Sequence, residues 1–418
     1  MLKIFKNVEL RKKLLFSALI IVVFRFLTHI PVPGVNLEAV RSYLSGNALF
    51  GIFDLFSGGA LLNFSVVTLG LGPYINSSII IQLFTKMIPS LEELSKEGEA
   101  GREKINFYTK LLTIPLSLIQ AYGVYFLLSR QGVIGQLEIL TLMVLLFTLV
   151  AGSMFMVWLG DLLTEYGLGQ GTSLLIFVGI ISQLPSGVLS VVSAAYSIPI
   201  YALIGILLLG LFVIVSVVMV NEGVKEVPIE YGRRGVRSEK VTNFLPIKIN
   251  QAGVIPIIFA VSIVLVPSLV AGPLMAVSHP VAQKVGVFLL QNFSNTSLAY
   301  NILYFSLVFG FTFFYTFMQF DPVKIADDIK KRGGFVPGIR PGKSTESYLR
   351  DIIVKLTTSG AVFLGTIAIL PYIVQLITGF SGLSIGGTGL LIVVSVVLDS
   401  VRQGQSLMVT KSYRSFLD

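Results

Sequence analysis

The stretch DLFSGGALLNFSV, residues 54–66, is apolar but is interrupted by a Gly-Gly pair, an Asn and two Ser. It opens an uncharged run from Leu55 to Thr85. A helix crosses the bilayer core with about 20 residues, so this run is too long for one straight span and too short for two. Irregular backbone at membrane depth must be buried in protein or line a water-filled cavity. We predict that residues 54–66 form a short re-entrant helix in an aqueous vestibule and that a span starts near Val67. An interfacial helix on the outer surface is the alternative.

The composition indicates a membrane protein. The chain has 418 residues, of which 54% are hydrophobic and 13% are charged, about half the charged fraction of a soluble domain. The first apolar run, from Leu14, is not followed by a small-residue cleavage site, so we interpret it as a retained span. Cysteine is absent, which excludes thiolate metal sites, thiol nucleophiles and disulfides.

Apolar runs predict ten membrane spans, with turns at LPSG (184–187) and near TGFSG (378–382) inside the two longest uncharged stretches. Because each span contains few or no charged residues, the prediction is an all-α membrane protein. The spans lie near 14–30, 67–88, 108–128, 138–158, 172–190, 196–220, 252–272, 301–320, 352–376 and 386–404.

The basic residues predict the orientation of these spans, because short cytoplasmic loops collect Lys and Arg. All but five of the 31 basic residues lie at the N-terminus, in the loops that follow even-numbered spans or within the span ends that border those loops, or at or after the end of the tenth span. The five exceptions are Arg25, Arg41, Arg130, Lys284 and Lys355. Both termini are therefore predicted to be cytoplasmic.

Five spans on each side of an inversion indicate an inverted repeat, with an N-terminal half at 1–190 and a C-terminal half at 191–418. In such proteins, Gly/Pro-interrupted segments at matching positions of the halves mark the working site. The second spans match in this way: GLGPYINSSIIIQLF begins at Gly70 and QAGVIPIIFAVSIVL at Gln251. We predict that the active centre lies between them.

Isoleucines on these two spans are spaced to share a helical face. Ile75 and Ile79 are four residues apart, and Ile255 and Ile258 are three apart. An aliphatic constriction built from them would gate by dewetting, since it offers an ion no ligands to replace its hydration shell. Contact with lipid or with a neighbouring helix is the alternative.

Three other classes of function were weighed against the residues. A secondary transporter, the main alternative, also uses inverted repeats but usually carries ionisable groups near the bilayer centre. Here the spans offer mainly Arg25, Lys355 and Asp399, all toward span ends. An intramembrane protease is disfavoured because both histidines fall near outer loops and no HExxH occurs. GLGQG at 167–171 follows no strand, which argues against nucleotide binding.

Six stretches of the sequence resemble the SecY family (SecY/Sec61-alpha), whose bacterial members form the channel of the Sec protein translocon. They are GLGPYINSSIIIQLF, KEGEAGREKI, GLGQGTSLLIF, QAGVIPIIFA, GGFVPGIRPGKST and GGTGLLIVVSVVLDS, in the family's order and over essentially the whole chain. The resemblance implies two inverted five-helix halves around an hourglass pore, a re-entrant plug helix, and a lateral opening toward lipid.

The resemblance also assigns residues to the pore. The plug corresponds to Asp54, Leu55, Phe56, Ser57, Gly58, Gly59, Ala60, Leu61, Leu62 and Asn63. The aliphatic ring corresponds to Ile75, Ile79, Ile176, Ile255, Ile258 and Ile392. Thr172 departs from the family, which often carries an aliphatic residue there, and would widen or wet one side of the ring.

Two cytoplasmic loops, 221–250 and 321–350, are long, basic and rich in turn formers. Positive-inside topology, binding of ribosomal RNA phosphates and docking of a soluble motor are three explanations. The resemblance implies a platform shared by the ribosome and the SecA ATPase, with Arg340 foremost. The other basic residues of this predicted platform are Arg233, Arg234, Arg237, Lys330, Lys331 and Arg332. A short helix from near Pro322, ended by Gly333, is predicted to support the second loop.

The function implied by the family is a protein-conducting channel in the bacterial plasma (inner) membrane. It would pass unfolded polypeptides and release apolar segments of about 20 residues into lipid. Its partners would be the small subunits SecE and SecG, SecA, the ribosome, signal peptides and nascent chains. The channel itself is predicted to catalyse no reaction and to need no cofactor or metal, so the energy comes from a partner.

Overall fold

The computed structural model describes residues 8–33, 35–45, 54, 57–130, 132–135, 137–194, 200–231, 242–264, 266–276, 279–293, 297–378 and 387–414. The chain forms two compact units. The first contains Met1–Pro199, Leu265–Tyr300 and Phe380–Asp418, and the second contains Ile200–Val264 and Asn301–Gly379. Packing therefore groups the chain differently from sequence order, and the halves 1–190 and 191–418 stay a prediction.

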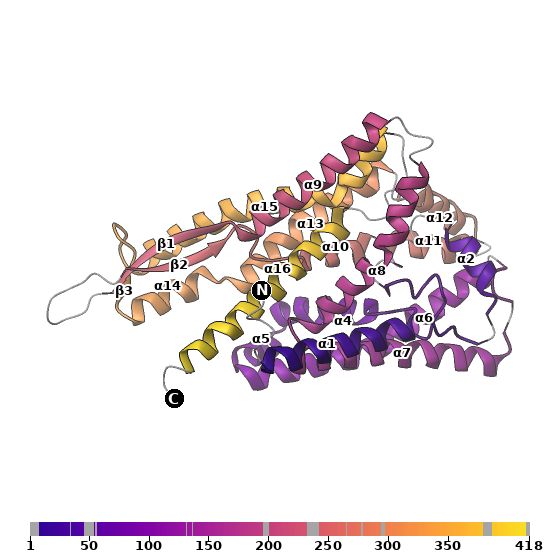
Figure 1. Cartoon of the computed structure of the whole chain (residues 1–418), viewed down its shortest axis with the longest axis horizontal. Helices are drawn as coiled ribbons and strands as arrows, with labels where there is room; N and C mark the ends of the chain where they lie inside the picture. Colours follow the sequence, from indigo (N-terminus) through magenta and orange to yellow (C-terminus); the bar gives the residue numbers. More distant parts are fainter. Residues whose placement is uncertain are drawn as a thin grey trace. The chain divides into compact units, whose positions relative to one another are not determined.

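The first unit is helical. α6 packs between α4 and α7, and α1 runs along α7 (Figure 1). α8 packs against α7 and α16, and α11 pairs with α12. The helices of this unit are α1 (Val8–Leu27), α2 (Leu37–Ser45), α4 (Gly72–Met87), α5 (Pro89–Lys96), α6 (Glu99–Arg130), α7 (Ile139–Tyr166), α8 (Gly171–Ala194), α11 (Val266–Ala276), α12 (Pro280–Asn292) and α16 (Gly387–Arg414).

The second unit combines helices with a small sheet. Its helices are α9 (Ile200–Glu222), α10 (Ile255–Val264), most of α13 (Leu298–Gln319), α14 (Pro322–Lys331) and α15 (Lys343–Thr378). α15 packs against α9, α10 and α14. Its strands are β1 (Val224–Tyr231), β2 (Thr242–Lys248) and β3 (Gly334–Phe335).

Each of the ten predicted spans contains helix, which confirms the helical class of the chain. Four helical stretches within the described residues are long and apolar enough to cross a membrane: Glu99–Ser129, Ile139–Tyr166, Leu298–Lys331 and Lys343–Ile377. Gly171–Pro185, Leu207–Glu222 and Ile255–Val264 are apolar but shorter. The count of ten crossings stays a prediction.

One predicted boundary, which relied on a proline, is wrong. The turn predicted at LPSG does not form, since α8 continues through Pro185 to Ala194; proline is tolerated within membrane helices because neighbouring groups satisfy the freed carbonyl. The predicted span 252–272 contains α10, which ends at Val264, and the start of α11 at Val266, and Leu265 between them lies outside the described residues.

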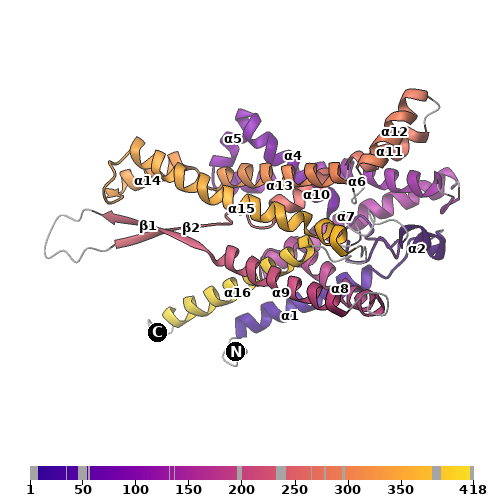
Figure 2. The same cartoon turned by 90° about the horizontal axis from the view of Figure 1, so that it is seen from above.

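A three-stranded antiparallel sheet was not predicted; it combines two strands of the loop 221–250 with one strand of the loop 321–350. Its order is β2-β1-β3, and Val227 pairs with Leu245 in the β1–β2 register. Val227, Ile229 and Ile247 are buried, so apolar side chains alternate along the strands as a one-sided sheet requires. The hairpin lies beside α14 and the start of α15 (Figure 2). The all-α class therefore holds for the predicted spans but not for these loops.

We predict that Ile247→Ala opens the hairpin. Ile247 is 1% exposed, and replacing a buried Ile by Ala costs about 2–5 kcal/mol. Cleavage of the intact chain by protease within 224–248 should accelerate more than about tenfold, because cleavage follows the population of the open form. Phe244→Ala on the same strand is the control, since Phe244 is 56% exposed. Equal cleavage rates for the two variants would contradict the burial argument.

Candidate functional site: a buried turn segment and an exposed basic platform

Residues 54–71 are here named the turn segment, and the predicted short helix within it stays a prediction. Asp54 and Ser57 have helical backbone, residues 58–71 are mainly turns, and α4 starts at Gly72 rather than near Val67. Gly58 and Gly59 have φ of 70° and 86°, and Gly70 has φ of 52°. This left-handed backbone favours glycine and ends any helix. Asp54 is described, whereas Leu55 and Phe56 lie outside the described residues.

The turn segment is buried in the first unit. Ala60 and Phe64 have no exposed surface, and Leu61 and Val67 are also buried. Leu61 and Phe64 belong to an apolar cluster with side chains from α2, α6 and α7. The outer-surface interfacial helix is therefore excluded for residues 57–67. Burial in protein is what irregular backbone at membrane depth requires.

The C-terminal end of the turn segment is held through its backbone. Val32 N–H donates to the Phe64 carbonyl at 2.9 Å, and Val66 N–H donates to the Ile30 carbonyl at 3.0 Å. The Ser153 hydroxyl of α7 donates to the Gly70 carbonyl at 3.1 Å. A Cβ on Gly152 would lie 1.9 Å from the Val66 carbonyl oxygen, so only glycine allows this approach of α7.

The N-terminal end is held through side chains. The Gln183 amide of α8 donates to the Asp54 carbonyl and to Asp54 Oδ2, both at 2.8 Å. Arg25 Nη1 of α1 donates to the Gly58 carbonyl at 2.7 Å, and its charge also attracts the Asp54 carboxylate. Asn63 Nδ2 donates to the Thr28 carbonyl at 3.2 Å.

Asp54 also organises the segment internally. Its Oδ1 accepts from the N–H groups of Leu61 and Leu62 at 3.1 and 3.0 Å and from the Ser57 hydroxyl at 3.4 Å. Asp54 is 1% exposed, and a buried carboxylate is tolerated only when it is hydrogen-bonded. Gln183 was not predicted as a site residue, although a single amide side chain within an apolar span is a signal of a buried polar contact.

The predicted ring isoleucines lie on four helices. Ile75 and Ile79 lie on α4, and Ile176 and Ile392 lie on α8 and α16 of the same unit; Ile255 and Ile258 lie on α10 of the second unit. All are buried except Ile75 and Ile255, which are half-buried. Their convergence on one ring stays a prediction.

Thr172 has a packing role. A Cβ on Gly160 of α7 would lie 3.0 Å from its methyl carbon. The methyl group therefore fills the space beside Gly160 of α7, and the effect of Thr172 on the ring stays a prediction.

The GLGQG motif forms the turn between α7 and α8. A Cβ on Gly171 would lie 2.0 Å from the Gly160 carbonyl oxygen. Leu168 N–H donates to the Ser17 hydroxyl of α1 at 3.2 Å, and Gly169 N–H donates to Gln403 of α16. The glycines of this motif are therefore explained by the close packing of α1, α7, α8 and α16, and not by nucleotide binding.

The loop 321–350 forms the predicted short helix, α14. Asp321 caps it by accepting from the N–H groups of Val323 and Lys324 at 3.0 and 3.4 Å, and Gly333 with φ of 71° follows its end. Arg340 is exposed on the turn between α14 and α15. Its carbonyl accepts from the Thr345 hydroxyl at 3.0 Å, which fixes the backbone of the turn.

We name the exposed residues Lys330, Lys331, Arg332 and Arg340 the basic platform. Beneath it, an apolar cluster joins the sheet, α14 and α15, and includes Val227, Ile329, Val336 and Leu349. The predicted residues Arg233, Arg234 and Arg237 lie outside the described residues.

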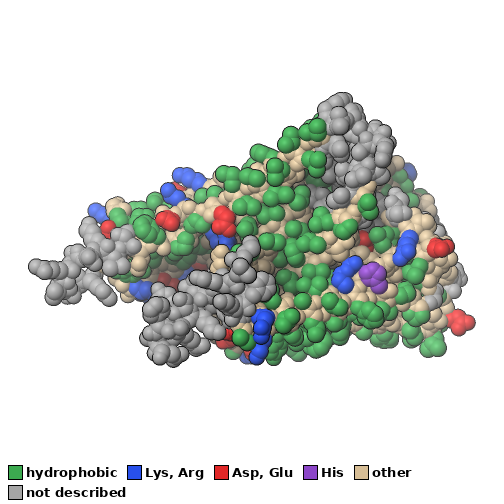
Figure 3. All heavy atoms as spheres, in the orientation of Figure 1, with side chains coloured by type: hydrophobic (Ala, Val, Ile, Leu, Met, Phe, Trp, Pro, Cys, Tyr) green, Lys and Arg blue, Asp and Glu red, His purple; other side chains and the backbone are tan. Residues whose placement is uncertain are grey.

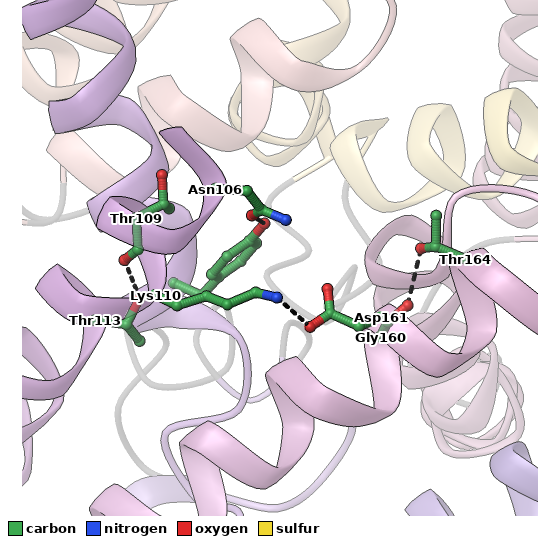
Figure 4. A network of polar contacts seen from close by, with 8 residues as sticks. Asn106, Thr109, Lys110, Thr113, Gly160, Asp161 and Thr164 are labelled. Carbon is green, nitrogen blue, oxygen red and sulfur yellow. Dashed lines mark hydrogen bonds and ion pairs between the residues drawn. The ribbon is translucent and has the colours of Figure 1, made fainter. Parts of the chain in front are cut away.

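A polar group between α6 and α7 was not predicted. Lys110 Nζ lies 2.7 Å from Asp161 Oδ2 (Figure 4). On the same turn of α6, Asn106 accepts from the Tyr74 hydroxyl at 3.4 Å. Both ion-pair residues are partly exposed, so the pair contributes little to stability.

Large apolar side chains are exposed on the long helices, including Leu140, Met143, Phe147 and Trp158 of α7. The face drawn in Figure 3 is covered largely by hydrophobic side chains in its helical part. Exposed apolar surface of this extent suits contact with lipid. Among the described residues, no group of three or more His, Asp or Glu side chains is placed to hold a metal ion.

The sequence profile of the SecY family matches residues 65–401. The protein translocase subunit SecY of Halalkalibacterium halodurans is 39% identical over 428 residues, covering 99% of this chain and 98% of the relative. The chain belongs to the SecY family. The SecY subunits of Aquifex aeolicus and Streptomyces coelicolor, at 39% and 40% identity, match over the same shares of both chains.

Solved structures of the SecY family share this fold. A structure described as a protein-conducting channel has a TM-score of 0.62 at 21% identity, covering 95% of this chain and 92% of that one. A SecY structure whose plug domain is described as stabilising the closed state has a TM-score of 0.66 at 21% identity with the same coverage. Sec61 in a canine ribosome-channel complex has a TM-score of 0.59 at 20% identity, again with the same coverage.

We predict that Gly152→Ala displaces the turn segment in this SecY-family chain. The new Cβ would collide with the Val66 carbonyl oxygen at 1.9 Å, and overpacking of this kind costs about 1–3 kcal/mol. The purified variant should unfold at a lower temperature in detergent. Gly123→Ala is the matched control, since a Cβ there meets nothing within 4 Å. An unchanged unfolding temperature for Gly152→Ala would show that α7 does not seat Val66.

Proposed function

We propose that this chain is the protein-conducting subunit of a bacterial translocase, which passes unfolded polypeptides across the plasma membrane. The observation that carries the proposal is the full-length similarity to translocase subunits at 38–40% identity. Channels of this family do not catalyse a reaction, so a partner supplies the energy. The secondary transporter is disfavoured because Lys355 and Asp399 are exposed and Arg25 is used to hold the turn segment.

In this proposal the turn segment is the plug that stops the pore. The proposal is supported by three features of the turn segment: it is buried, its turns depend on glycine, and side chains attach its N-terminal end. These features suit a segment that can leave its site. The six isoleucines would form the constriction, since aliphatic side chains hinder ions by dewetting and adapt to any passing sequence. Apolar segments of about 20 residues would leave sideways into lipid, which they already favour.

The basic platform would bind the ribosome and a SecA-type motor. Its support by a packed apolar cluster favours a fixed docking surface over a flexible loop. Among the structural relatives, Sec61 is described in a ribosome-channel complex and yeast Ssh1 in a complex with the 80S ribosome. The proposal also includes the small subunits SecE and SecG as partners. It places both termini in the cytoplasm, because Lys and Arg collect in the loops on that side.

We predict that deleting residues 56–64 raises the resting ion conductance of the reconstituted channel, because the deletion removes the apolar body of the turn segment. Single-channel recording in planar bilayers measures it. Val22→Ala, on the exposed face of α1, is the control. An unchanged baseline after the deletion would remove the turn segment from the seal.

We predict that Arg340→Glu reduces motor-driven export of a preprotein into vesicles by at least about tenfold, since reversing a docking charge weakens electrostatic attraction. Lys324→Glu on α14 is the matched control, because it is also an exposed basic residue but lies a turn or more from the basic platform. Equal export by both variants would exclude a specific role of Arg340.

A further inference from the structure

The two ends of the turn segment are attached by different kinds of contact. Residues 64–70 are fixed by backbone bonds to Ile30 and Val32 and by the Ser153 bond to Gly70. Gly58 and Asp54 are attached to α1 and α8 by side-chain donors, Arg25 and Gln183 respectively. Side-chain bonds can break without disturbing either helix. The N-terminal end is therefore the releasable one, and the C-terminal end is the hinge.

Gln183 forms two hydrogen bonds with the N-terminal end of the turn segment. Its Nε2 donates to both the backbone carbonyl and the carboxylate of Asp54 at 2.8 Å. An amide nitrogen has two hydrogens, so both are used on one residue. The bond to the carboxylate is charge-assisted and about twice as strong as a neutral one. A polar side chain in an apolar span is costly without a partner, and Asp54 provides two acceptors for Gln183.

Asp54 transmits this contact to the rest of the segment. Its other carboxylate oxygen accepts from the N–H groups of Leu61 and Leu62. Moving Asp54 away from α8 therefore moves residues 61 and 62 with it, or else takes the carboxylate acceptor from both N–H groups and leaves Leu61 only the Ser57 hydroxyl, at 3.2 Å. Because these hydrogen bonds form one network, we expect the residues bonded to Asp54 to leave their site together.

We propose that Gln183 is the latch of the turn segment: its two bonds to Asp54 set how readily the segment leaves its site. The inference rests on the proposed function and adds a residue that determines the opening threshold. Breaking the latch exposes Asp54 and Gln183 to water in the vestibule, where both regain hydrogen bonds. The free-energy difference between the two arrangements is therefore moderate, as a repeatedly opened channel needs.

The test measures the latch independently of ion flow. The chain contains no cysteine, so Ala60→Cys places a single thiol at a position with no exposed surface. Labelling of the reconstituted full chain by a membrane-impermeant maleimide then reports displacement of the segment. Gln183→Leu, which removes both donors at similar volume, should raise the labelling rate and the resting conductance about tenfold or more. Ser182→Ala is the control, because its hydroxyl bonds only to the Gly179 carbonyl of its own helix among the described contacts.

Two further variants separate a latch from a general loss of folding. Asp54→Asn breaks the contact from the other side, because its Nδ2 faces the Gln183 donor, while its Oδ1 still accepts from Leu61 and Leu62. The double variant Asp54→Asn/Gln183→Glu restores a charge-assisted bond with the donor and acceptor exchanged. Its labelling rate should return toward the wild-type value.

Labelling rates of Gln183→Leu and Asp54→Asn equal to that of Ser182→Ala would overturn the latch. If deletion of residues 56–64 still raised the conductance, the seal by the turn segment would stand without it. If the deletion also had no effect, both the latch and the sealing role would be wrong.

Discussion

The structure of the first unit depends on one constraint: the turn segment places irregular backbone among membrane helices, so its polar groups need partners within the protein. An unpaired buried peptide group costs several kcal/mol in hydrocarbon. Asp54 accepts from two N–H groups of the segment, and the loop after α1 exchanges bonds with residues 64 and 66. The positions of Ser153 and Gly152 on α7 serve the same requirement. Helices α1, α7 and α8 are thus arranged around this segment.

In the second unit, the basic platform lies over an apolar cluster that joins the sheet, α14 and α15. α15 has 36 residues and is about 54 Å long at 1.5 Å per residue. Its first part packs under the sheet and α14, and its later part is one of the stretches able to cross a membrane. A partner that binds the basic platform therefore acts on an element continuous with a membrane span.

The sequence predicted the features that depend on local chemistry. The apolar runs located helices at all ten predicted spans, and α14 has the predicted start at Pro322 and end before Gly333. The family resemblance is confirmed by full-length similarity. The polar contacts of α8 could not be predicted from the sequence, because the bond between Asp54 and Gln183 joins residues 129 positions apart. Periodicity within one helix carries no information on such a pair.

The features that the sequence did not predict also have physical causes. The apolar character of residues 54–66 gave no sign that helical backbone stops at Ser57, where Gly58 and Gly59 adopt left-handed backbone. A Cβ on Gly58 would also lie 2.9 Å from the Gly179 Cα of α8. The strands β1 and β2 each contain a proline, Pro228 and Pro246, which is normally a sign against a strand. These prolines and the surrounding basic residues concealed the alternation of Val227 and Ile229.

The central claim is that a polypeptide passes the aliphatic face of α4 beside the turn segment. Site-specific photocrosslinking of a stalled export substrate tests it most directly, with the probe placed at Ile79 or, as a control, at Phe147 on the exposed face of α7, where the side chain is 67% exposed. The account predicts a strong crosslink from position 79 and none from position 147. A substrate captured at position 147 but not at position 79 would contradict it.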